Sequence, residues 1–531
     1  MDESKELENT QEIDQFIEDQ YLCELFGGGR CHLCALNRHN CLPSNMKDDS
    51  NEDIIQRSIG SLGRWHIFMC VIISFVKLPV AWLQLSIVFI APPASFTCTD
   101  NRTAQCGANC TGHNFDRSVF TETIITEWDL VCNRAYLANL AQTLTMLGIL
   151  FGNMLFGYLS DRLGRRSPLI CAVFLQVLCG MGAAVSPWFP LFLVLRFIAA
   201  LATGGTMVMS FVLVMEIVGM KWRTTLGILY QIPFNMGLLT LPLFAYFLRD
   251  WHHFHIAICV PGILLLSYYW LLPESPRWLL AVGRKSDAIE VLQLAARRNK
   301  RPTAPIPANV DTYMERRQLQ GGAHSGDILD LVRTPTMRTY TACIGYNWFA
   351  CGLCFFGGAQ YIGQLGGNIF VNIALSAVMQ IPSTFFSLWA VSAWGRKYTL
   401  VFSNVLSGLS CLLIGGIPPE PTWVRTVLSS VDMFALAISF PTVYLYSGEL
   451  FPTVVRNAGV GTSSMFARVG SMAAPFVAGL VLVREWLPPL VFGLAPLIGA
   501  LLCFKLPETV GCKLPDTVEE AEALGRKKVV E

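Results

Sequence analysis

Charged residues are scarce in this sequence. Asp, Glu, Lys and Arg make up 15% of the 531 residues, whereas soluble domains carry roughly 25%. The mean hydropathy is +0.46, and 53% of the residues are hydrophobic. This composition excludes an ordinary soluble domain and is typical of a protein that lies in a membrane.

Motifs for catalysis and for nucleotide binding are also missing. The chain has no Walker loop, no nucleophile elbow and no complete metal-ligand motif. We therefore expect neither an enzyme nor an ATP-driven pump. We also expect no cofactor, no metal site and no nucleic-acid partner.

The first 60 residues lack the apolar core of a cleavable signal peptide, so we expect none. They are polar and acidic and contain Cys23, Cys31, Cys34 and Cys41. Cys31 and Cys34 have the spacing of one zinc-ligand pair, but a second pair at standard spacing is missing. Structural zinc stays an alternative to disorder or simple reduced thiols.

Twelve apolar stretches have the length of membrane-spanning helices, which need about 20 residues. Proline-rich turns and two long polar segments separate them. We place the spans near 66–90, 136–158, 168–187, 190–213, 225–247, 254–272, 340–362, 369–391, 399–417, 424–446, 458–482 and 487–505. The predicted fold class is an all-α membrane protein with twelve transmembrane helices.

Positive charge marks every second connecting segment, and this bias indicates the cytoplasmic side. We expect a multi-pass protein of the plasma membrane with both termini in the cytoplasm. Segment 92–135 then lies outside, where glycosylation and disulfide formation take place. Its sequons are at Asn101 and Asn109, and its cysteines are Cys98, Cys106, Cys110 and Cys132. We expect two disulfides, with the pairing left open.

Three landmarks recur in the two halves of the chain. Glu216 is followed seven residues later by Arg223, as Glu449 is by Arg456, and 449 − 216 gives an offset of 233. The motifs at 164–166 and 273–275 recur at 395–397 and 507–509, with offsets of 231 and 234. We infer a duplicated six-helix unit, an architecture of transporters that bind substrate near the membrane midplane between the repeats. A hydrated, charged pocket is expected there.

The domain boundaries follow from these spans. We expect a cytoplasmic N-terminal region, two six-helix halves, a cytoplasmic loop with short helices and a cytoplasmic tail. These are residues 1–65, 66–279 (with the extracellular loop 92–135), 280–337, 338–506 and 507–531, in chain order with the loop between the halves.

Several motifs together resemble one family. Residues 157–166 (Gly-Tyr-Leu-Ser-Asp-Arg-Leu-Gly-Arg-Arg) are similar to the major facilitator signature. Residues 126–132, 216–219, 273–279 and 449–457 resemble the organic cation/anion/zwitterion transporter family, solute carrier family 22. The resemblance covers roughly 60–510. It implies a major facilitator fold and a polyspecific carrier of small organic ions, without fixing the sign of their charge.

Charged residues gather at the predicted cytoplasmic ends of the helices. We expect them to form ion pairs that latch the two halves together when the carrier faces outward, and that break when it faces inward. These gate residues are Asp161, Arg165, Arg166, Glu216, Arg223, Glu274, Arg277, Glu449 and Arg456. Ordinary positive-inside charges with solvated partners are the alternative.

Ionisable residues inside a span normally face a cavity or a partner. Lys77 lies in the first span and Arg468 in the eleventh. We expect Asp432 near the outer surface as a rim charge, and a structural role for Arg196. The resemblance implies that cation carriers have an acid at position 468 and many have a glutamate near Gln380, so the residues here favour an anion or a zwitterion.

The resemblance also implies further substrate contacts. Aromatic walls suit a polyspecific site because rings bind apolar bodies and cations without strict geometry. Packing or lipid contact is the alternative for each ring. The candidates are Gln231, Gln380, Asn347, Trp348, Phe355, Met207, Phe211 and Tyr444.

The sequence therefore predicts a monomeric carrier that moves a small organic ion across a lipid bilayer by alternating access. A carboxylate-bearing zwitterion or an organic anion is favoured. The alternatives are an organic cation transporter, in which Arg468 is structural, and a transport-silent receptor or binding protein. The coupling ion is left open.

Overall fold

The computed structural model describes residues 54–99, 106, 112–319, 329–418, 420, 422–452, 455–510, 515 and 518–526. The four N-terminal cysteines, Cys110 and both sequon asparagines (Asn101 and Asn109) lie outside these residues. The expectations for them stay predictions.

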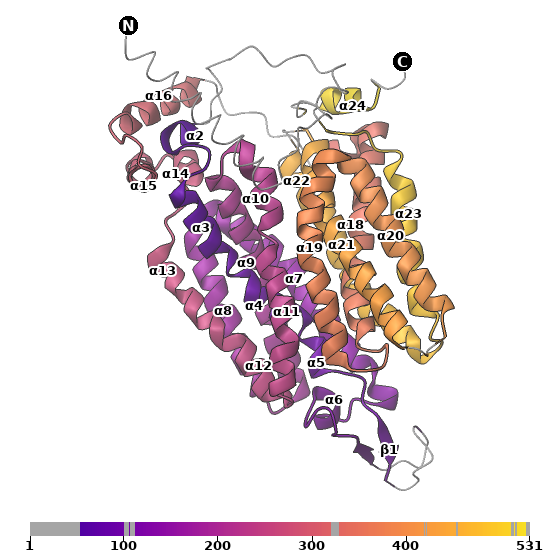
Figure 1. The fold of residues 1–531 in the computed structure, drawn as a ribbon. Helices are drawn as coiled ribbons and strands as arrows, with labels where there is room; N and C mark the ends of the chain where they lie inside the picture. The colour runs from indigo at the N-terminus through magenta and orange to yellow at the C-terminus, as the bar shows by residue number, and fades with distance from the viewer. Residues whose placement is uncertain are drawn as a thin grey trace, which may run out of the picture. The chain divides into compact units, whose positions relative to one another are not determined.

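The apolar runs of the N-terminal half form six spans that lie side by side (Figure 1). Several spans are broken into shorter helices. They are α3 (Arg64–Ser74) with α4 (Lys77–Leu85) and α5 (Ile87–Ile90); α7 (Tyr136–Leu163); α8 (Arg166–Ala184); α9 (Phe189–Ile217); α10 (Arg223–Leu229) with α11 (Ile232–Phe247); and α12 (Trp251–Cys259) with η4 (Val260–Ser267) and α13 (Tyr268–Leu271).

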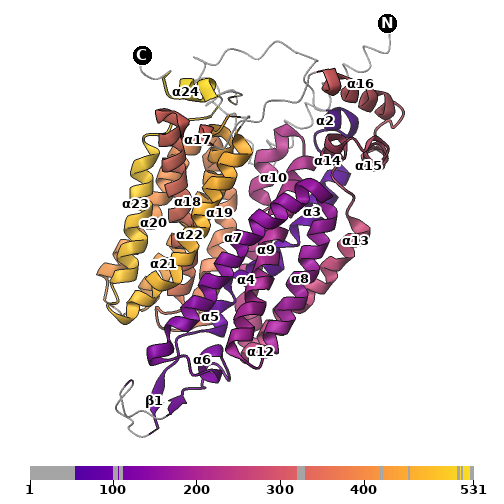
Figure 2. The ribbon, with the colours of Figure 1, turned by 180° about the vertical axis from the view of Figure 1, so that it is seen from behind.

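The C-terminal half supplies six more spans, which stand beside the first six in Figures 1 and 2. They are α18 (Pro335–Ile362), α19 (Ile369–Ala393), α20 (Arg396–Gly416), α21 (Thr422–Leu450), α22 (Arg456–Gly479) with η5 (Leu480–Leu482), and α23 (Leu487–Cys503). The twelve spans coincide with the predicted stretches, so the all-α twelve-helix prediction is confirmed.

Side chains at the helix starts explain several boundaries. The Thr334 hydroxyl accepts a hydrogen bond from the Met337 N–H at the start of α18. Asn368 accepts from the N–H groups of Phe370 and Val371 at the start of α19. These caps satisfy backbone donors that have no partner within the helix.

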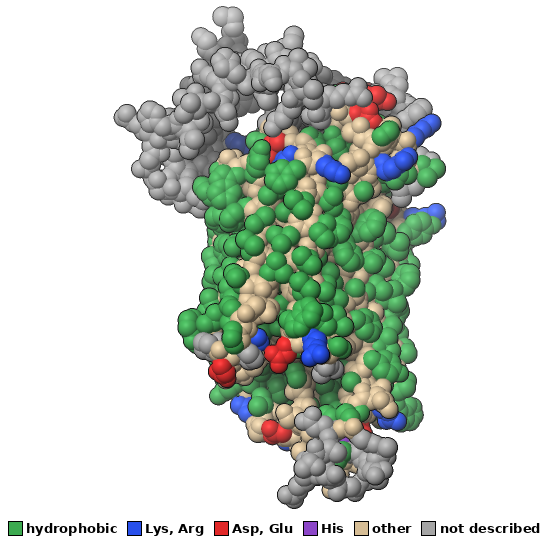
Figure 3. All heavy atoms as spheres, turned by 90° about the vertical axis from the view of Figure 1, so that its right-hand side faces the viewer, with side chains coloured by type: hydrophobic (Ala, Val, Ile, Leu, Met, Phe, Trp, Pro, Cys, Tyr) green, Lys and Arg blue, Asp and Glu red, His purple; other side chains and the backbone are tan. Residues whose placement is uncertain are grey.

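The surface of the bundle is suited to lipid. Hydrophobic side chains cover the middle of the face in Figure 3, whereas Lys, Arg, Asp and Glu lie toward its two ends. The N-terminal half also exposes large apolar side chains, such as Phe247 (77% exposed) and Leu264 (75%). Water would penalise so much exposed apolar area, and acyl chains do not.

One end of the bundle, which we call the loop end, carries a small subdomain with a two-stranded sheet. Strand β1 (Phe96–Cys98) pairs antiparallel with β2 (His113–Phe115), followed by α6 (Ile124–Glu127) and η2 (Cys132–Arg134). A disulfide joins Cys106 to Cys132, and Cys98 is disulfide-bonded as well. The disulfide expectation is thus confirmed for these three cysteines.

The opposite end, which we call the motif end, carries the short helices. They are α2 (Ile54–Ile59), η3 (Met220–Trp222), α14 (Pro276–Val282), α15 (Lys285–Arg298), α16 (Ile306–Leu319), α17 (Asp330–Arg333) and α24 (Val518–Arg526). Asn299 follows α15 and ties it to the first span: its side chain accepts from the Trp65 N–H (2.8 Å) and donates to the Ile59 carbonyl (2.9 Å).

Candidate substrate site between the two halves

The two halves pack against each other toward the loop end. The Thr143 hydroxyl on α7 donates to the Met472 carbonyl on α22 (3.1 Å). The ring of Phe89 on α5 stacks on that of Phe370 on α19, with centroids 5.8 Å apart. These contacts close the interface between the halves on the loop side.

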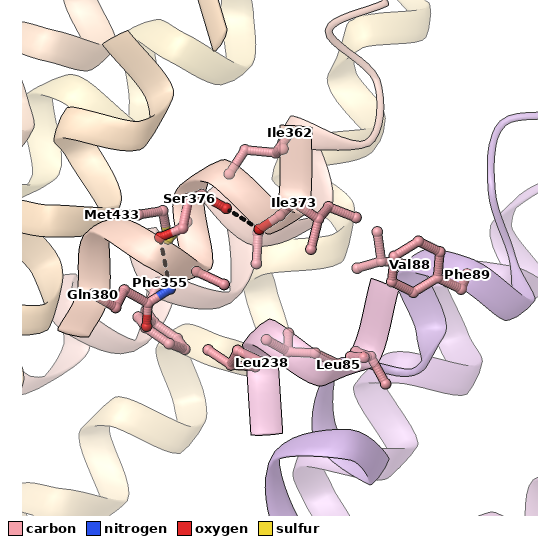
Figure 4. Close-up of a pocket in the computed structure, with 13 residues that line it drawn as sticks. Leu85, Val88, Phe89, Leu238, Phe355, Ile362, Ile373, Ser376, Gln380 and Met433 are labelled. Atoms are coloured by element: carbon pink, nitrogen blue, oxygen red, sulfur yellow. Dashed lines mark hydrogen bonds between the residues drawn. The ribbon is translucent and has the colours of Figure 1, made fainter. Parts of the chain in front are cut away.

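A small apolar cavity lies in this interface. Leu85, Val88 and Phe89 face Ile373 and other residues of the C-terminal half across it (Figure 4). Its volume is about 20 Å³, and one water molecule needs roughly 10–15 Å³. The hydrated, charged pocket that the sequence predicted is not found here, because apolar side chains of both halves close on each other.

Two cations lie close together on the motif side of this cavity. Lys77 is the first residue of α4 and is 6% exposed. Arg468 is half-buried on α22 and near enough to Lys77 for the two charges to repel each other. Among the described residues, neither cation has a carboxylate partner.

Aromatic rings surround these cations. The Lys77 Nζ lies 4.7 Å from the ring centroid of Tyr230 and 6.0 Å from that of Phe234. Arg468 lies near Tyr444 on α21, which is 37% exposed. The face of the Tyr230 ring therefore supplies part of the electrostatic stabilisation that a carboxylate usually gives to a buried ammonium such as that of Lys77.

One aromatic contact joins the halves toward the motif end. The rings of Phe211 on α9 and Tyr444 have centroids 4.9 Å apart, and Trp348 lies 5.2 Å from Tyr444 on the other side. The Trp348 Nε1 donates to the Ser447 hydroxyl (2.9 Å), which fixes the indole. These three predicted contact residues are therefore brought together.

Other predicted contacts lie nearer the cavity. Gln380 and Phe355 line it, and the Gln380 Oε1 is buried without a hydrogen-bond partner in the described chain. Gln231 directly precedes α11, makes no side-chain capping hydrogen bond, and is half-buried. The Met207 sulfur on α9 accepts a hydrogen bond from the Gln84 side chain on α4, within the N-terminal half (2.9 Å).

The expectation for Asn347 is wrong. Its side chain is fully buried and points toward α20 and α23 within the C-terminal half. It accepts from the Asn404 amide (2.7 Å) and donates to the carbonyls of Cys343 and Gly499. A fully hydrogen-bonded amide in the interior of one half serves packing.

The expectation of Asp432 as a rim charge is also wrong. Asp432 is 2% exposed and accepts a hydrogen bond of 2.5 Å from the Ser407 hydroxyl between α21 and α20. Arg196 is buried too, and its Nε donates to the Thr145 hydroxyl (2.9 Å). Neither the Asp432 carboxylate nor the Arg196 guanidinium therefore reaches the solvent-exposed end of the bundle.

At the motif end, the predicted gate charges of the N-terminal half pair with each other. Arg165 forms ion pairs of 2.8 Å with Glu216 and with Asp161. Partial burial opposes the charge of Arg165, but the two carboxylates outweigh it and raise the pKa of the guanidinium. Glu274 accepts from the backbone N–H groups of Arg165 (2.7 Å) and Arg166 (3.3 Å) at the start of α8.

The C-terminal half repeats this arrangement. Arg396 pairs with Glu449 at 2.8 Å. Glu508 accepts from the backbone N–H groups of Arg396 (3.0 Å) and Lys397 (3.1 Å) at the start of α20. A carboxylate at a helix start satisfies free N–H groups and interacts favourably with the helix dipole. The sequence repeat is thus a repeat of contacts.

Three further gate arginines donate hydrogen bonds to backbone carbonyls. Arg223 donates to Val218 and Arg456 to Phe451, while Arg277 donates to the Glu216 carbonyl. Each of these gate contacts lies within one half, in a structure that is closed at the loop end. The expected latch between the halves in the outward-facing state is not tested by these contacts and stays a prediction.

Sequence reasoning missed two residues of the site, Tyr230 and Phe234. They are four residues apart, so they lie on one face of the helical segment beside Gln231. The side-chain amide of Asn235, the residue after Phe234, donates a hydrogen bond to the backbone carbonyl of Gln380 across the interface between the halves (3.1 Å). The signal that could have identified them is their four-residue spacing around the predicted contact residue Gln231.

Comparison with known proteins agrees with this geometry. The sugar (and other) transporter family matches residues 94–520. The chain is 36% identical to the organic cation transporter protein of Drosophila melanogaster, over 79% of this chain and 77% of that protein. It is 34% identical to solute carrier family 22 member 13 of Homo sapiens, over 82% and 78% of the two chains.

The fold has counterparts among solved structures. The inward open conformation of the xylose transporter from E. coli superposes with a TM-score of 0.62 at 18% identity, over 86% of this chain and 99% of that one. This likeness shows the fold alone. The relatives and the fold are those of transporters and not of enzymes. The chain is a multi-pass membrane protein that belongs to the sugar (and other) transporter family of the major facilitator superfamily and, within it, to solute carrier family 22.

Proposed function

We propose that this organic-ion transporter carries small molecules that bear a carboxylate, either zwitterions or organic anions. The observation that carries the proposal is the pair Lys77 and Arg468, two cations close together with no carboxylate partner in the described chain. A charge in a medium of low dielectric interacts strongly with an opposite charge. A substrate carboxylate supplies that missing charge.

The two cations offer different contacts. The Arg468 guanidinium is a planar fork that binds both oxygens of a carboxylate. Lys77 is a compact charge held against the Tyr230 ring. Phe211, Trp348 and Tyr444 supply apolar surface for the body of the substrate, and rings accept bodies of different shapes.

Transport follows from the arrangement of the halves. We propose that the loop end faces the outside of the plasma membrane and the motif end the cytoplasm, as the positive-inside bias indicates. The packed loop end then closes the outer path, while Arg468 and Tyr444 keep exposed surface on the cytoplasmic side. Rocking of the two halves about the site exchanges these states.

The gate residues have a role in this cycle. Asp161, Arg165 and Glu216 hold the N-terminal half as one body, and Arg396 and Glu449 do the same for the C-terminal half. We propose that these clusters keep each half rigid during rocking, and that the exposed carboxylate of Asp161 contacts the other half when the carrier faces outward.

An organic cation carrier is the second candidate. The likeness to the organic cation transporter protein of Drosophila melanogaster favours it, and aromatic rings attract cations. Lys77 and Arg468 oppose it, because a cation placed between them meets two like charges. In this second function Arg468 serves packing alone.

Uptake of three probes separates these functions. Cells that express the chain are given a quaternary amine, a carnitine-like zwitterion and an aromatic carboxylate. We expect uptake of the zwitterion or the carboxylate well above that of mock-transfected cells. Uptake of the quaternary amine alone would establish the cation carrier. No uptake of any probe, with the protein at the cell surface, would favour the transport-silent receptor.

A further inference from the structure

A cluster of exposed cations lies at the motif end, where the first span begins at Arg64. It belongs to two short segments, 54–68 and 291–301, that contain no Asp or Glu. Helix α15 contacts both α2 and α3, so the two segments lie side by side (Figures 1 and 2). The exposed cations of this surface, which we call the basic cluster, are Arg57, Arg64, Arg297, Arg298, Lys300 and Arg301.

Packing between the two segments fixes the backbone of the basic cluster. Leu292 and Ala296 of α15 are buried in one hydrophobic cluster with Ile59 of α2. Asn299 lies among the cations, and its side chain hydrogen-bonds to the Trp65 N–H and the Ile59 carbonyl. The start of the first span and the end of α15 therefore present their charges from one fixed surface.

The described chain does not neutralise the charge of the basic cluster. Among the residues that the structure describes, none of the six cations forms an ion pair. Arg165 and Arg396 at the same end differ, because each of them pairs with a glutamate. Like charges that lie close together repel each other. The folded chain therefore gains stability from an anion bound at this surface.

Large exposed apolar side chains border the basic cluster. Ile67, Phe68 and Phe75 of the first span are 44–52% exposed. The Arg298 guanidinium lies over the Phe68 ring, 5.5 Å from its centroid. Leu294 is four residues before Arg298, so it shares a face of α15 with it, and it is also exposed. An apolar stem that follows apolar surface and ends in a charge is the arrangement of an arginine at the boundary between acyl chains and headgroups.

We propose that the basic cluster binds the headgroups of anionic phospholipids in the leaflet beside the motif end. A guanidinium binds two oxygens of a phosphate at once. A lipid fits better than a soluble anion, because its acyl chains contact Phe68 and the exposed residues near it. With the orientation proposed above, this leaflet is the cytoplasmic one, which carries the anionic lipids. The cluster includes neither Lys77 nor Arg468, so the proposal does not depend on the substrate.

The test is a lipid titration of the purified full-length protein in detergent micelles, which have no sidedness, so the result does not depend on the orientation. Phosphatidylserine, phosphatidylcholine or inorganic phosphate is added at constant ionic strength, and thermal unfolding is followed by intrinsic fluorescence. We expect the melting temperature to rise with phosphatidylserine and to saturate, as for a ligand that binds the folded state. No rise, or an equal rise with phosphatidylcholine or with inorganic phosphate, would overturn the proposal.

Removal of charge locates the bound lipid. Arg298→Gln is expected to raise the phosphatidylserine concentration of half-maximal stabilisation about fivefold, and the triple variant with Arg297→Gln and Arg301→Gln about a hundredfold. Arg162→Gln is the matched control, because Arg162 is also exposed at the motif end and lies over an exposed ring, 4.6 Å from the centroid of Tyr158. An unchanged midpoint in the triple variant, or an equal increase in the control, would contradict the proposal.

A variant that conserves the charge separates lipid binding from packing, and it decides the question where the triple variant does not fold. Arg298→Lys keeps a cation at the same position but changes the shape of the side chain. We expect its midpoint for phosphatidylserine to lie closer to that of the natural chain than to that of Arg298→Gln. A midpoint as high as that of Arg298→Gln would show that the charge is not what binds, and would overturn the proposal.

Discussion

The ring of Phe211 in the N-terminal half lies 4.9 Å from the ring of Tyr444 in the C-terminal half, with 64° between their planes. Phe211 is five residues from Glu216 on α9, and Tyr444 is five residues from Glu449 on α21. The contact therefore joins equivalent positions of the repeat, between the central cations and the motif end.

Removal of this contact shifts the balance between the two states of the carrier. Phe211→Ala loses an aromatic pair that contributes about 0.5–1.5 kcal/mol to the state closed at the loop end, so the state open at the loop end becomes more populated. Because substrate outside binds that state, we expect the KM for uptake to fall about 2–10-fold. Phe247→Ala on the exposed face of α11 is the control, and an equal KM in all three proteins would contradict the role.

Lys77 is expected to aid transport at a cost in stability. Lys77→Met removes one of two charges that attract a carboxylate, so we expect the KM for the carboxylate probe to rise roughly tenfold. The same substitution removes an unpaired buried charge, so we expect a higher melting temperature. Lys505→Met, at an exposed position, should change neither. A stable variant with unchanged KM would remove Lys77 from the site.

Gly164 is expected to be irreplaceable at the motif end. Its φ is +95°, and a Cβ there meets the Glu274 carboxylate that caps α8. Gly283 has a similar φ of +84°, but a Cβ there meets nothing within 4 Å. Gly283 has the left-handed helical conformation (ψ 11°), which costs a side chain about 1–2 kcal/mol, whereas Gly164 (ψ 173°) has a conformation that is essentially restricted to glycine. We therefore expect Gly164→Ala to lower the melting temperature clearly more than Gly283→Ala, and equal losses would contradict the capping role.

The orientation predicts glycosylation of the loop end. Treatment with an N-glycosidase should increase the electrophoretic mobility of the protein from cells. The double substitution Asn101→Gln and Asn109→Gln should remove this shift. A shift that persists in the double variant, or none in the natural chain, would speak against an extracellular loop end.

The helices were predictable because long apolar runs and their Pro and Gly boundaries are properties of the local sequence. Arg468 could be singled out as a candidate from the sequence because a charge is rare within a span and because the family resemblance extends over its helix. The repeat of Glu216 and Glu449 indicated a duplicated arrangement, and in the structure the two glutamates pair with Arg165 and with Arg396, which was not among the predicted gate residues.

Side-chain direction was not predictable from the same sequence. Asn347 and Trp348 are adjacent in sequence, yet they point in different directions. The Asn347 amide contacts Asn404 in the interior of the C-terminal half, whereas the Trp348 indole contacts Tyr444 beside the central site. Asp432 is buried against Ser407 because α20 packs on α21. This packing between two helices cannot be predicted from the local sequence pattern around either residue. The size of a cavity likewise depends on how two halves close.

Charge reversal at Arg468 tests the central claim most directly. Uptake of the aromatic carboxylate and of the quaternary amine is measured for the natural chain and for Arg468→Asp, each normalised to protein at the cell surface. We predict that the substitution abolishes carboxylate uptake, because the substrate then meets a like charge in place of the guanidinium. Carboxylate uptake that is equal in the two proteins would contradict a substrate site at Arg468.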